Sequence, residues 1–176
     1  MTDDRRAMLQ AGGLGWLSGM VTHVTLLYQL GGIAVGFAVP GTVLGAVLGF
    51  WLWRRGQATA LNWGLFAVCV GIAWIAAYWL SVRIANDVNN LLLVGLFGGF
   101  VGATLMVVGG ALLFAFYRNP RWVALTIIMG TVLGMLLAAR FDDKPWVLLM
   151  PLFVIWQAAM GASFGYAAAK AMPAKA

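Results

Sequence analysis

Small polar side chains recur along the first apolar stretch of the chain. They follow one another at intervals of three or four residues, at Ser18, Thr22, Thr25 and Gln29. This spacing places side chains on one face of a helix. Unpaired polar groups are costly in hydrocarbon, so a stripe of this kind faces the interior of a helix bundle or a wet cavity. The stripe predicts either hydrogen bonds between helices or the wall of a path for a small solute.

His23 lies beside this stripe and is the only histidine in the chain. An imidazole can titrate near neutral pH, bind a metal or hydrogen-bond a ligand. No second histidine, glutamate or thiol accompanies it at ligand spacing, so we expect no metal site and instead a neutral imidazole bonded to a neighbouring helix. Cys69, the single cysteine, lies within an apolar stretch, and we expect it to be buried and unreactive.

Two further stretches carry polar or aromatic residues that suit a binding site. Arg83 and Asp87 follow Trp74 and Tyr78 in sequence, an order that fits the polar mouth of an aromatic-lined pocket or an interfacial anchor with a solvated charge pair. In the last apolar stretch Gln157 lies deep enough to need a hydrogen-bond partner. The candidate ligand-binding residues are therefore Ser18, Thr22, His23, Gln29, Trp74, Tyr78, Arg83, Trp156 and Gln157.

Several kinds of catalytic site are absent from the sequence. The chain has no glutamate, no aspartate within an apolar stretch and no Gly-Lys-Ser/Thr phosphate loop. Paired carboxylates and a Ser/His/Asp set of plausible depth are also missing. We therefore expect neither an enzyme nor a proton pump, which needs a titratable carboxylate within the membrane. The sequence indicates no particular cofactor.

The elements that must position these residues are apolar helices. Of the 176 residues 63% are hydrophobic and 9% charged, against about 25% charged in an average soluble domain. Residues 7–53 contain no charged residue, and as a helix they would span about 70 Å, enough to cross a bilayer twice. We predict one all-α membrane domain over residues 1–176, a six-helix bundle with helices at about 9–28, 33–53, 61–82, 91–117, 122–139 and 146–169.

The basic residues predict the orientation of this bundle. Six spans would place eight of them on one side, namely Arg5, Arg6, Arg54, Arg55, Arg118, Arg121, Lys170 and Lys175, and three on the other, namely Arg83, Arg140 and Lys144. Positive charge concentrates at cytoplasmic helix ends. Both termini are therefore expected in the cytoplasm, in a multi-pass protein of a bacterial-type inner membrane. Because the net charge of +6 is spread between apolar stretches, we expect no nucleic-acid partner.

Glycines at four-residue spacing predict close packing between helices. Such glycines stack on one helix face and let neighbouring backbones approach. They include Gly41, Gly45 and Gly49, then Gly95 with Gly99, and Gly98 with Gly102. These faces suit either packing within the bundle or an interface with another membrane subunit or a second copy of the chain.

Two short segments resemble a known membrane family. Residues 72–80, Ile-Ala-Trp-Ile-Ala-Ala-Tyr-Trp-Leu, resemble part of the second helix of the translocator-protein family, the tryptophan-rich sensory proteins. Residues 148–151, Leu-Leu-Met-Pro, with Trp156 look like the last helix of that family. Members have five spans and bind porphyrins or sterols, so the resemblance implies a hydrophobic ligand held by tryptophans. It covers about a sixth of the chain, which lacks the family's Trp-Tyr and double-proline elements after the first helix and has one helix more.

A broader similarity concerns architecture alone. The size, the expected helix number and the content of small residues are similar to those of the substrate-binding components of energy-coupling-factor importers. From the residues we predict a non-enzymatic integral membrane protein that binds or transports a small hydrophobic solute through a pocket between helices 9–28, 61–82 and 146–169. The alternative is an accessory, assembly or immunity subunit that docks onto another membrane protein through its glycine-rich faces.

Overall fold

The computed structural model describes residues 3–27, 32–88, 90–135 and 150–171. Within these ranges the chain forms helices and no strand, which confirms the all-α class. The α-helices are α1 (Asp3–Leu27), α2 (Gly32–Arg54), α3 (Ala60–Asp87), α4 (Leu91–Leu113), α5 (Pro120–Gly134) and α6 (Met150–Lys170), and a short 3-10 helix, η1 (Ala115–Arg118), follows α4.

Two of these helices, α3 and α4, are long and apolar enough to cross a membrane within the described part of the chain. α3 extends five residues beyond the expected end at residue 82, up to Asp87. The expected helix over 91–117 is instead two elements, because α4 ends at Leu113 and η1 follows. α1 begins at Asp3 rather than Leu9, since two acidic residues in the first turn favour a helix N-terminus. Residues 136–139 and 146–149 of the expected helices lie outside the described residues.

Local side-chain hydrogen bonds explain where three helices begin. Thr59 caps α3 by accepting a bond from the backbone N–H of Asn62 at 3.1 Å, and Asn90 caps α4 through the N–H of Leu93 at 3.2 Å. Asn119 caps α5 in the same way, and Pro120 occupies its first turn. Each cap satisfies a backbone donor that the helix itself leaves unpaired.

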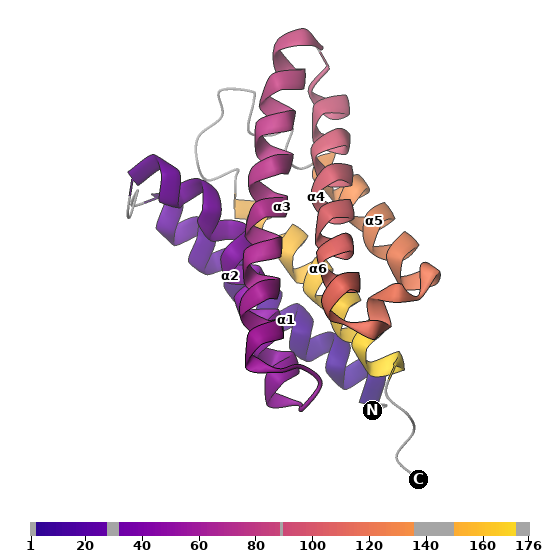
Figure 1. Cartoon of the computed structure of the whole chain (residues 1–176). Helices are drawn as coiled ribbons and strands as arrows, with labels where there is room; N and C mark the ends of the chain where they lie inside the picture. The colour runs from indigo at the N-terminus through magenta and orange to yellow at the C-terminus, as the bar shows by residue number, and fades with distance from the viewer. Residues whose placement is uncertain (1–2, 28–31, 89, 136–149, 172–176) are drawn as a thin grey trace.

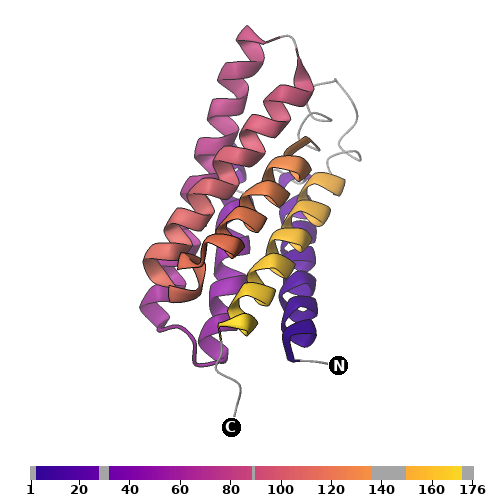
Figure 2. The ribbon, with the colours of Figure 1, turned by 90° about the vertical axis from the view of Figure 1, so that its right-hand side faces the viewer.

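Helices that are consecutive in sequence pack against each other, and the first helix packs against the last. α2 packs on α3, α3 on α4 and α4 on α5, while α1 and α6, from opposite ends of the chain, form an extensive interface. Figures 1 and 2 show both termini at the same end of the molecule as the connection from α2 to α3, with the connection from α3 to α4 at the opposite end. An ion pair between Lys170 and Asp4 joins the end of α6 to the start of α1.

An aromatic cluster fills the core near this end of the molecule. Phe66 of α3 packs against Phe114, with ring centroids 5.1 Å apart, and against Phe164 of α6, at 5.3 Å. Tyr117 of η1 lies 5.4 Å from Phe164. All four side chains are buried. The 3-10 helix therefore contributes to the core and holds the end of α4 against α6.

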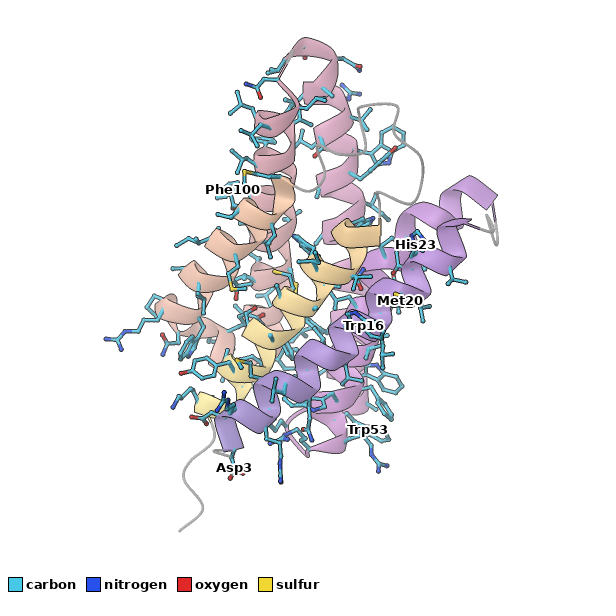
Figure 3. All side chains as sticks on the ribbon, turned by 180° about the vertical axis from the view of Figure 1, so that it is seen from behind. Asp3, Trp16, Met20, His23, Trp53 and Phe100 are labelled. Carbon is cyan, nitrogen blue, oxygen red and sulfur yellow. The ribbon has the colours of Figure 1, made fainter. Side chains whose placement is uncertain are left out.

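Large apolar side chains also cover the outside of the helices (Figure 3). On α3 they include Leu61, Leu65, Val68 and Ile72, and on α4 Leu92, Phe97, Phe100, Val108 and Leu112. Leu112 is 75% exposed and Leu61 is 69% exposed. Contiguous apolar surface of this kind marks a face that contacts lipid or another protein.

Candidate functional site

The polar stripe of α1 meets α6 in the interior of the bundle. The amide nitrogen of Gln157 donates to the hydroxyl of Thr22 at 3.4 Å and to the backbone carbonyl of Pro40 at 3.2 Å. Ser18 lies one turn before Thr22, and all three side chains are 0–1% exposed. Ser18, Thr22 and Gln157 form a polar cluster, in which the hydrogen bonds of Gln157 join α6 to α1 and α2.

Two oxygen atoms of the polar cluster keep their capacity to accept a bond. Oε1 of Gln157 and Oγ of Ser18 are buried and have no hydrogen-bond partner among the described residues. A buried polar atom without a partner costs about 1–3 kcal/mol. The polar cluster is therefore a place where one further donor would stabilise the fold.

The remaining polar candidates do not belong to the polar cluster. His23, next to Thr22 on α1, is 9% exposed. Arg83 is exposed near the C-terminal end of α3. Tyr78 is half-buried and packs edge-on against Trp79, with ring centroids 6.2 Å apart. Gln29 lies outside the described residues.

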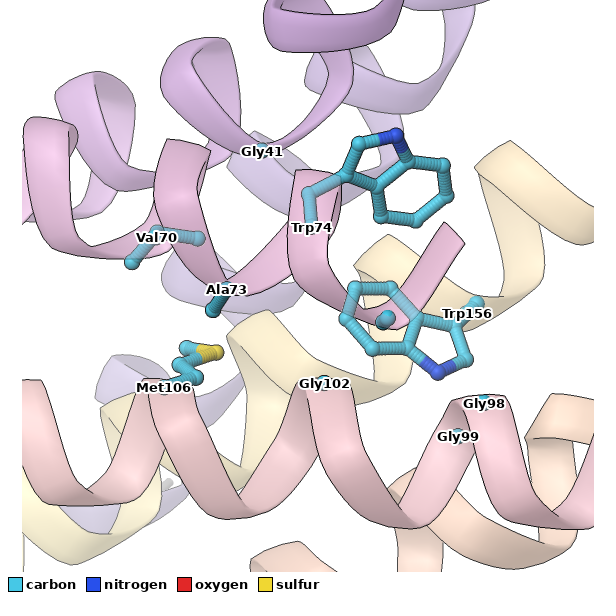
Figure 4. A pocket seen from close by; sticks show the side chains of 10 residues that line it. Gly41, Val70, Ala73, Trp74, Gly98, Gly99, Gly102, Met106 and Trp156 are labelled. Atoms are coloured by element: carbon cyan, nitrogen blue, oxygen red, sulfur yellow. The ribbon is translucent and has the colours of Figure 1, made fainter. Parts of the chain in front are cut away.

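A cavity lies in the middle of the bundle between α2, α3, α4 and α6 (Figure 4). Its walls are glycines and apolar side chains, namely Gly41, Val70, Ala73, Trp74, Ala77, Gly98, Gly99, Gly102, Met106 and Trp156. None of these residues carries a charge. A volume of about 20 Å³ is open to a water-sized sphere, which is room for about one water molecule.

Two of the tryptophans named as candidates meet at this cavity. The ring of Trp74 on α3 and the ring of Trp156 on α6 lie edge to face, with centroids 5.8 Å apart and an interplanar angle of 68°. The indole N–H of Trp156 donates to the backbone carbonyl of Gly130 on α5 at 3.4 Å. Figure 4 shows the two rings at one end of the cavity and Val70, Ala73 and Met106 toward the other.

The cavity differs from the pocket expected between the first, third and last helices. α3 and α6 line it, but α1 does not, and α2 and α4 contribute instead. α1 is too close to α6 to leave a cavity, because a Cβ atom at Gly15 would overlap the backbone carbonyl of Gln157, and one at Gly161 would overlap that of Ala11. The polar cluster is adjacent to the cavity, since Gln157 follows Trp156 and Pro40 precedes Gly41.

The glycine faces pack against helices of the same chain. A Cβ atom at Gly45 would lie 2.8 Å from the Cα of Ala67, and one at Gly49 would lie 2.8 Å from the ring of Trp63, so α2 fits closely on α3. Gly41 of α2 likewise faces Val70 and Trp74 of α3. On α4, Gly95 and Gly99 face Gly134 and Gly130 of α5, and Gly102 faces Ala77 of α3. Gly98 is buried at the cavity.

Sequence reasoning missed the part that α4 plays in the cavity. Three of its glycines, Gly98, Gly99 and Gly102, lie within five residues, and we interpreted them as residues of helix packing or of an interface with another subunit. Glycines on one face also leave space where a large side chain on the opposite helix does not reach. Together with these glycines, the tryptophans of α3 and α6 were the sequence feature that indicated the cavity.

Comparison with protein-family models, with curated proteins and with solved structures finds no match to this chain. The local resemblance of residues 72–80 to the translocator-protein family therefore has no counterpart in these comparisons.

Proposed function

We propose that the chain is a multi-pass protein of a bacterial-type inner membrane with six spans and both termini in the cytoplasm. The length and apolar character of α3 and α4 support a membrane location, as does the apolar side-chain cover on their outer faces. A cytoplasmic position of the termini is supported by the basic residues Arg5, Arg6, Arg54, Arg55 and Lys170, which belong to helix ends on the side of the termini.

The proposed function is the binding of a small, neutral, apolar solute in the cavity that Trp74 and Trp156 border at one end (Figure 4). The observation that carries it is the edge-to-face pair of indoles over an uncharged wall of glycine and alanine. Indole faces bind aromatic and apolar groups, and ligand sites are typically apolar with few polar groups. A charged solute would lose its hydration there without gaining a partner.

A solute larger than one water molecule must displace part of the cavity wall. Met106 is an unbranched side chain with several rotatable bonds. Trp156 is 6% exposed and its indole N–H is bonded to the carbonyl of Gly130, so Met106 is the part of the wall that we expect to move. The proposed binding step is therefore a movement of Met106 that widens the cavity, selected or stabilised by the solute.

Solute binding is tested by native mass spectrometry of the protein purified from membranes in mild detergent. Gly102→Ala adds one methyl group beside a cavity with room for about one water molecule. The new Cβ would lie 3.2 Å from the Cβ of Ala77, which requires a shift of a few tenths of an ångström. Alanine is also a better helix former than glycine, so loss of folding is not the expected outcome. A small molecule that accompanies the wild-type chain and is absent from Gly102→Ala supports the proposal, whereas equal retention by both chains contradicts it.

Docking onto another membrane subunit through the glycine faces has less support. Those faces are covered by α3 and α5 of the same chain, at Ala67, Trp63, Gly130 and Gly134. A partner would have to displace a helix of the bundle in order to reach them. The cavity is therefore the better-supported candidate.

A further inference from the structure

A second hollow lies on the surface between the first half of α1 and the end of α2. Its polar end is formed by Arg54, Arg55, Gln10 and Trp51, and its apolar wall includes Leu9, Trp16 and Leu17. The groove is open to the outside along its length and lies apart from the interior cavity, with which it shares no residue. Figure 3 views the molecule from this side and shows Asp3, Trp16 and His23 in order along α1.

The two arginines at the polar end have no acidic partner among the described residues. Both side chains are exposed, and among the residues that the structure describes neither forms an ion pair. Arg55 is held in place by uncharged contacts, since its guanidinium donates to Oε1 of Gln10 at 3.4 Å and its Cζ lies 4.9 Å from the ring centroid of Trp51. The indole N–H of Trp51 donates to the same oxygen at 3.5 Å. This network orients one cation and leaves its positive charge unneutralised.

The apolar wall runs from the arginines toward the middle of the bundle. Leu9, Trp16 and Leu17 are 55%, 47% and 53% exposed. Leu9 and Leu17 are two helical turns apart, a span of about 12 Å along α1. Gly13 lies between them, and a Cβ atom there would meet nothing within 4 Å. The wall is therefore an open apolar strip that begins at a pair of cations.

We propose that this groove binds an anionic phospholipid, with the headgroup phosphate at Arg54 and Arg55 and an acyl chain along Leu9, Gly13 and Leu17. Guanidinium groups suit phosphate because they donate parallel hydrogen bonds. The arginines belong to the basic end of the molecule, where anionic lipids of the cytoplasmic leaflet would lie. The inference depends on the proposed membrane location and is independent of the proposed solute cavity.

The lipid site is tested by native mass spectrometry of the full chain in mild detergent with added phosphatidylglycerol or phosphatidylcholine. We expect phosphatidylglycerol to be retained at least about tenfold better than phosphatidylcholine, and Arg54→Gln with Arg55→Gln to lower that retention by about 30-fold. Arg118→Gln with Arg121→Gln removes the same charge outside the groove and should change retention by less than about threefold. Equal loss in the two double variants, or equal retention of the two lipids, would overturn the lipid site.

Gly13→Leu tests the apolar half of the groove without removing charge. The new side chain extends into open space, and leucine is a better helix former than glycine, so the fold should be kept. Phosphatidylglycerol retention should fall by about tenfold, while excess inorganic phosphate should leave retention by the wild-type chain unchanged. Unchanged retention in Gly13→Leu, or displacement of the lipid by phosphate, would contradict a site that holds the acyl chain. A chain recovered outside the membrane fraction would instead overturn the membrane location.

Discussion

The indole rings of Trp74 and Trp156 meet edge to face, 5.8 Å apart, at one end of a cavity that α2, α3, α4 and α6 enclose. The two residues belong to α3 and α6 and are 82 positions apart in sequence. An aromatic pair in this geometry contributes about 0.5–1.5 kcal/mol beyond the area that it buries. The pair therefore helps to hold α3 against α6 as well as forming the wall of the proposed solute site.

Replacement of Trp156 by alanine should remove both of these contributions. We expect Trp156→Ala to lower the free energy of unfolding in detergent by about 3–5 kcal/mol, because the side chain is buried. Trp79→Ala is the matched control, since Trp79 lies on α3 and is 56% exposed; its effect should stay below about 1 kcal/mol. A denaturant titration followed by circular dichroism measures both changes, and similar values for the two variants would argue against a buried role for Trp156.

The interface between α1 and α6 allows a comparison of two glycines within one helix. Gly15→Ala should destabilise the fold by about 1–3 kcal/mol or more, because its Cβ would overlap the backbone of Gln157. Gly13→Ala should be neutral or stabilise by up to about 1 kcal/mol, because no atom lies within 4 Å of its Cβ. Thermal unfolding of the two variants measures the difference. A destabilised Gly13→Ala, or an unaffected Gly15→Ala, would mean that α1 and α6 pack differently.

Gln157 should affect stability more than solute binding. Gln157→Leu removes the hydrogen bonds to Thr22 and to the carbonyl of Pro40, and we expect a loss of about 1–3 kcal/mol in the free energy of unfolding. Since Gln157 does not line the cavity, solute affinity should change by less than about threefold. Thr22→Val should lower stability in the same direction. A loss of solute binding in a stable Gln157→Leu variant would place the solute at the polar cluster instead of the cavity.

The ion pair between Lys170 and Asp4 predicts a pH dependence at the ends of the chain. The ammonium nitrogen of Lys170 lies 2.5 Å from Oδ2 of Asp4, and the hydrogen bond and charge of Asp4 raise the pKa of Lys170 above its ordinary value of 10.5. Because the pKa is higher in the folded state, the stabilisation is complete below pH 10.5 and is lost as the pH rises through the raised pKa. The effect should be small and weakened by salt, since both groups are partly exposed.

Asp4→Asn provides the control for this pH dependence. The wild-type chain should have the higher Tm near neutral pH, and the difference should vanish at a pH above the raised pKa of Lys170. Arg5→Gln changes the charge of the same helical turn without touching the pair, so its Tm difference should not vary over that range. A Tm difference for Asp4→Asn that persists at the highest pH would show that the pair does not act through the charge of Lys170.

Hydrophobic periodicity and capping residues were sufficient to predict much of the helical order. The Asn119–Pro120 start of α5 was readable because its chemistry is local. The break at Leu113 was not, because η1 exists through tertiary contacts of Phe114 and Tyr117 with Phe164 of α6. Local propensity carries no information about such contacts.

The sequence predicted only part of the candidate site, because it does not specify which helices meet. The side chains of Thr22 and Gln157 were expected to seek partners, and they bond to each other, because a buried polar group requires a partner wherever it lies. The exclusion of α1 from the cavity was not predicted, because it depends on the close approach of Gly15 to Gln157. This contact joins residues 142 positions apart, and periodicity in one sequence does not specify which helices meet.

The most direct test of the solute cavity is native mass spectrometry of three chains purified in the same way: wild type, Gly102→Ala and Arg54→Gln with Arg55→Gln. We expect one small neutral molecule that accompanies the wild-type chain and the double arginine variant but is lost from Gly102→Ala, whose added methyl group narrows the cavity at its wall. A molecule retained equally by all three chains, or no bound molecule in the wild-type chain, would contradict a solute site in the cavity beside Trp74 and Trp156.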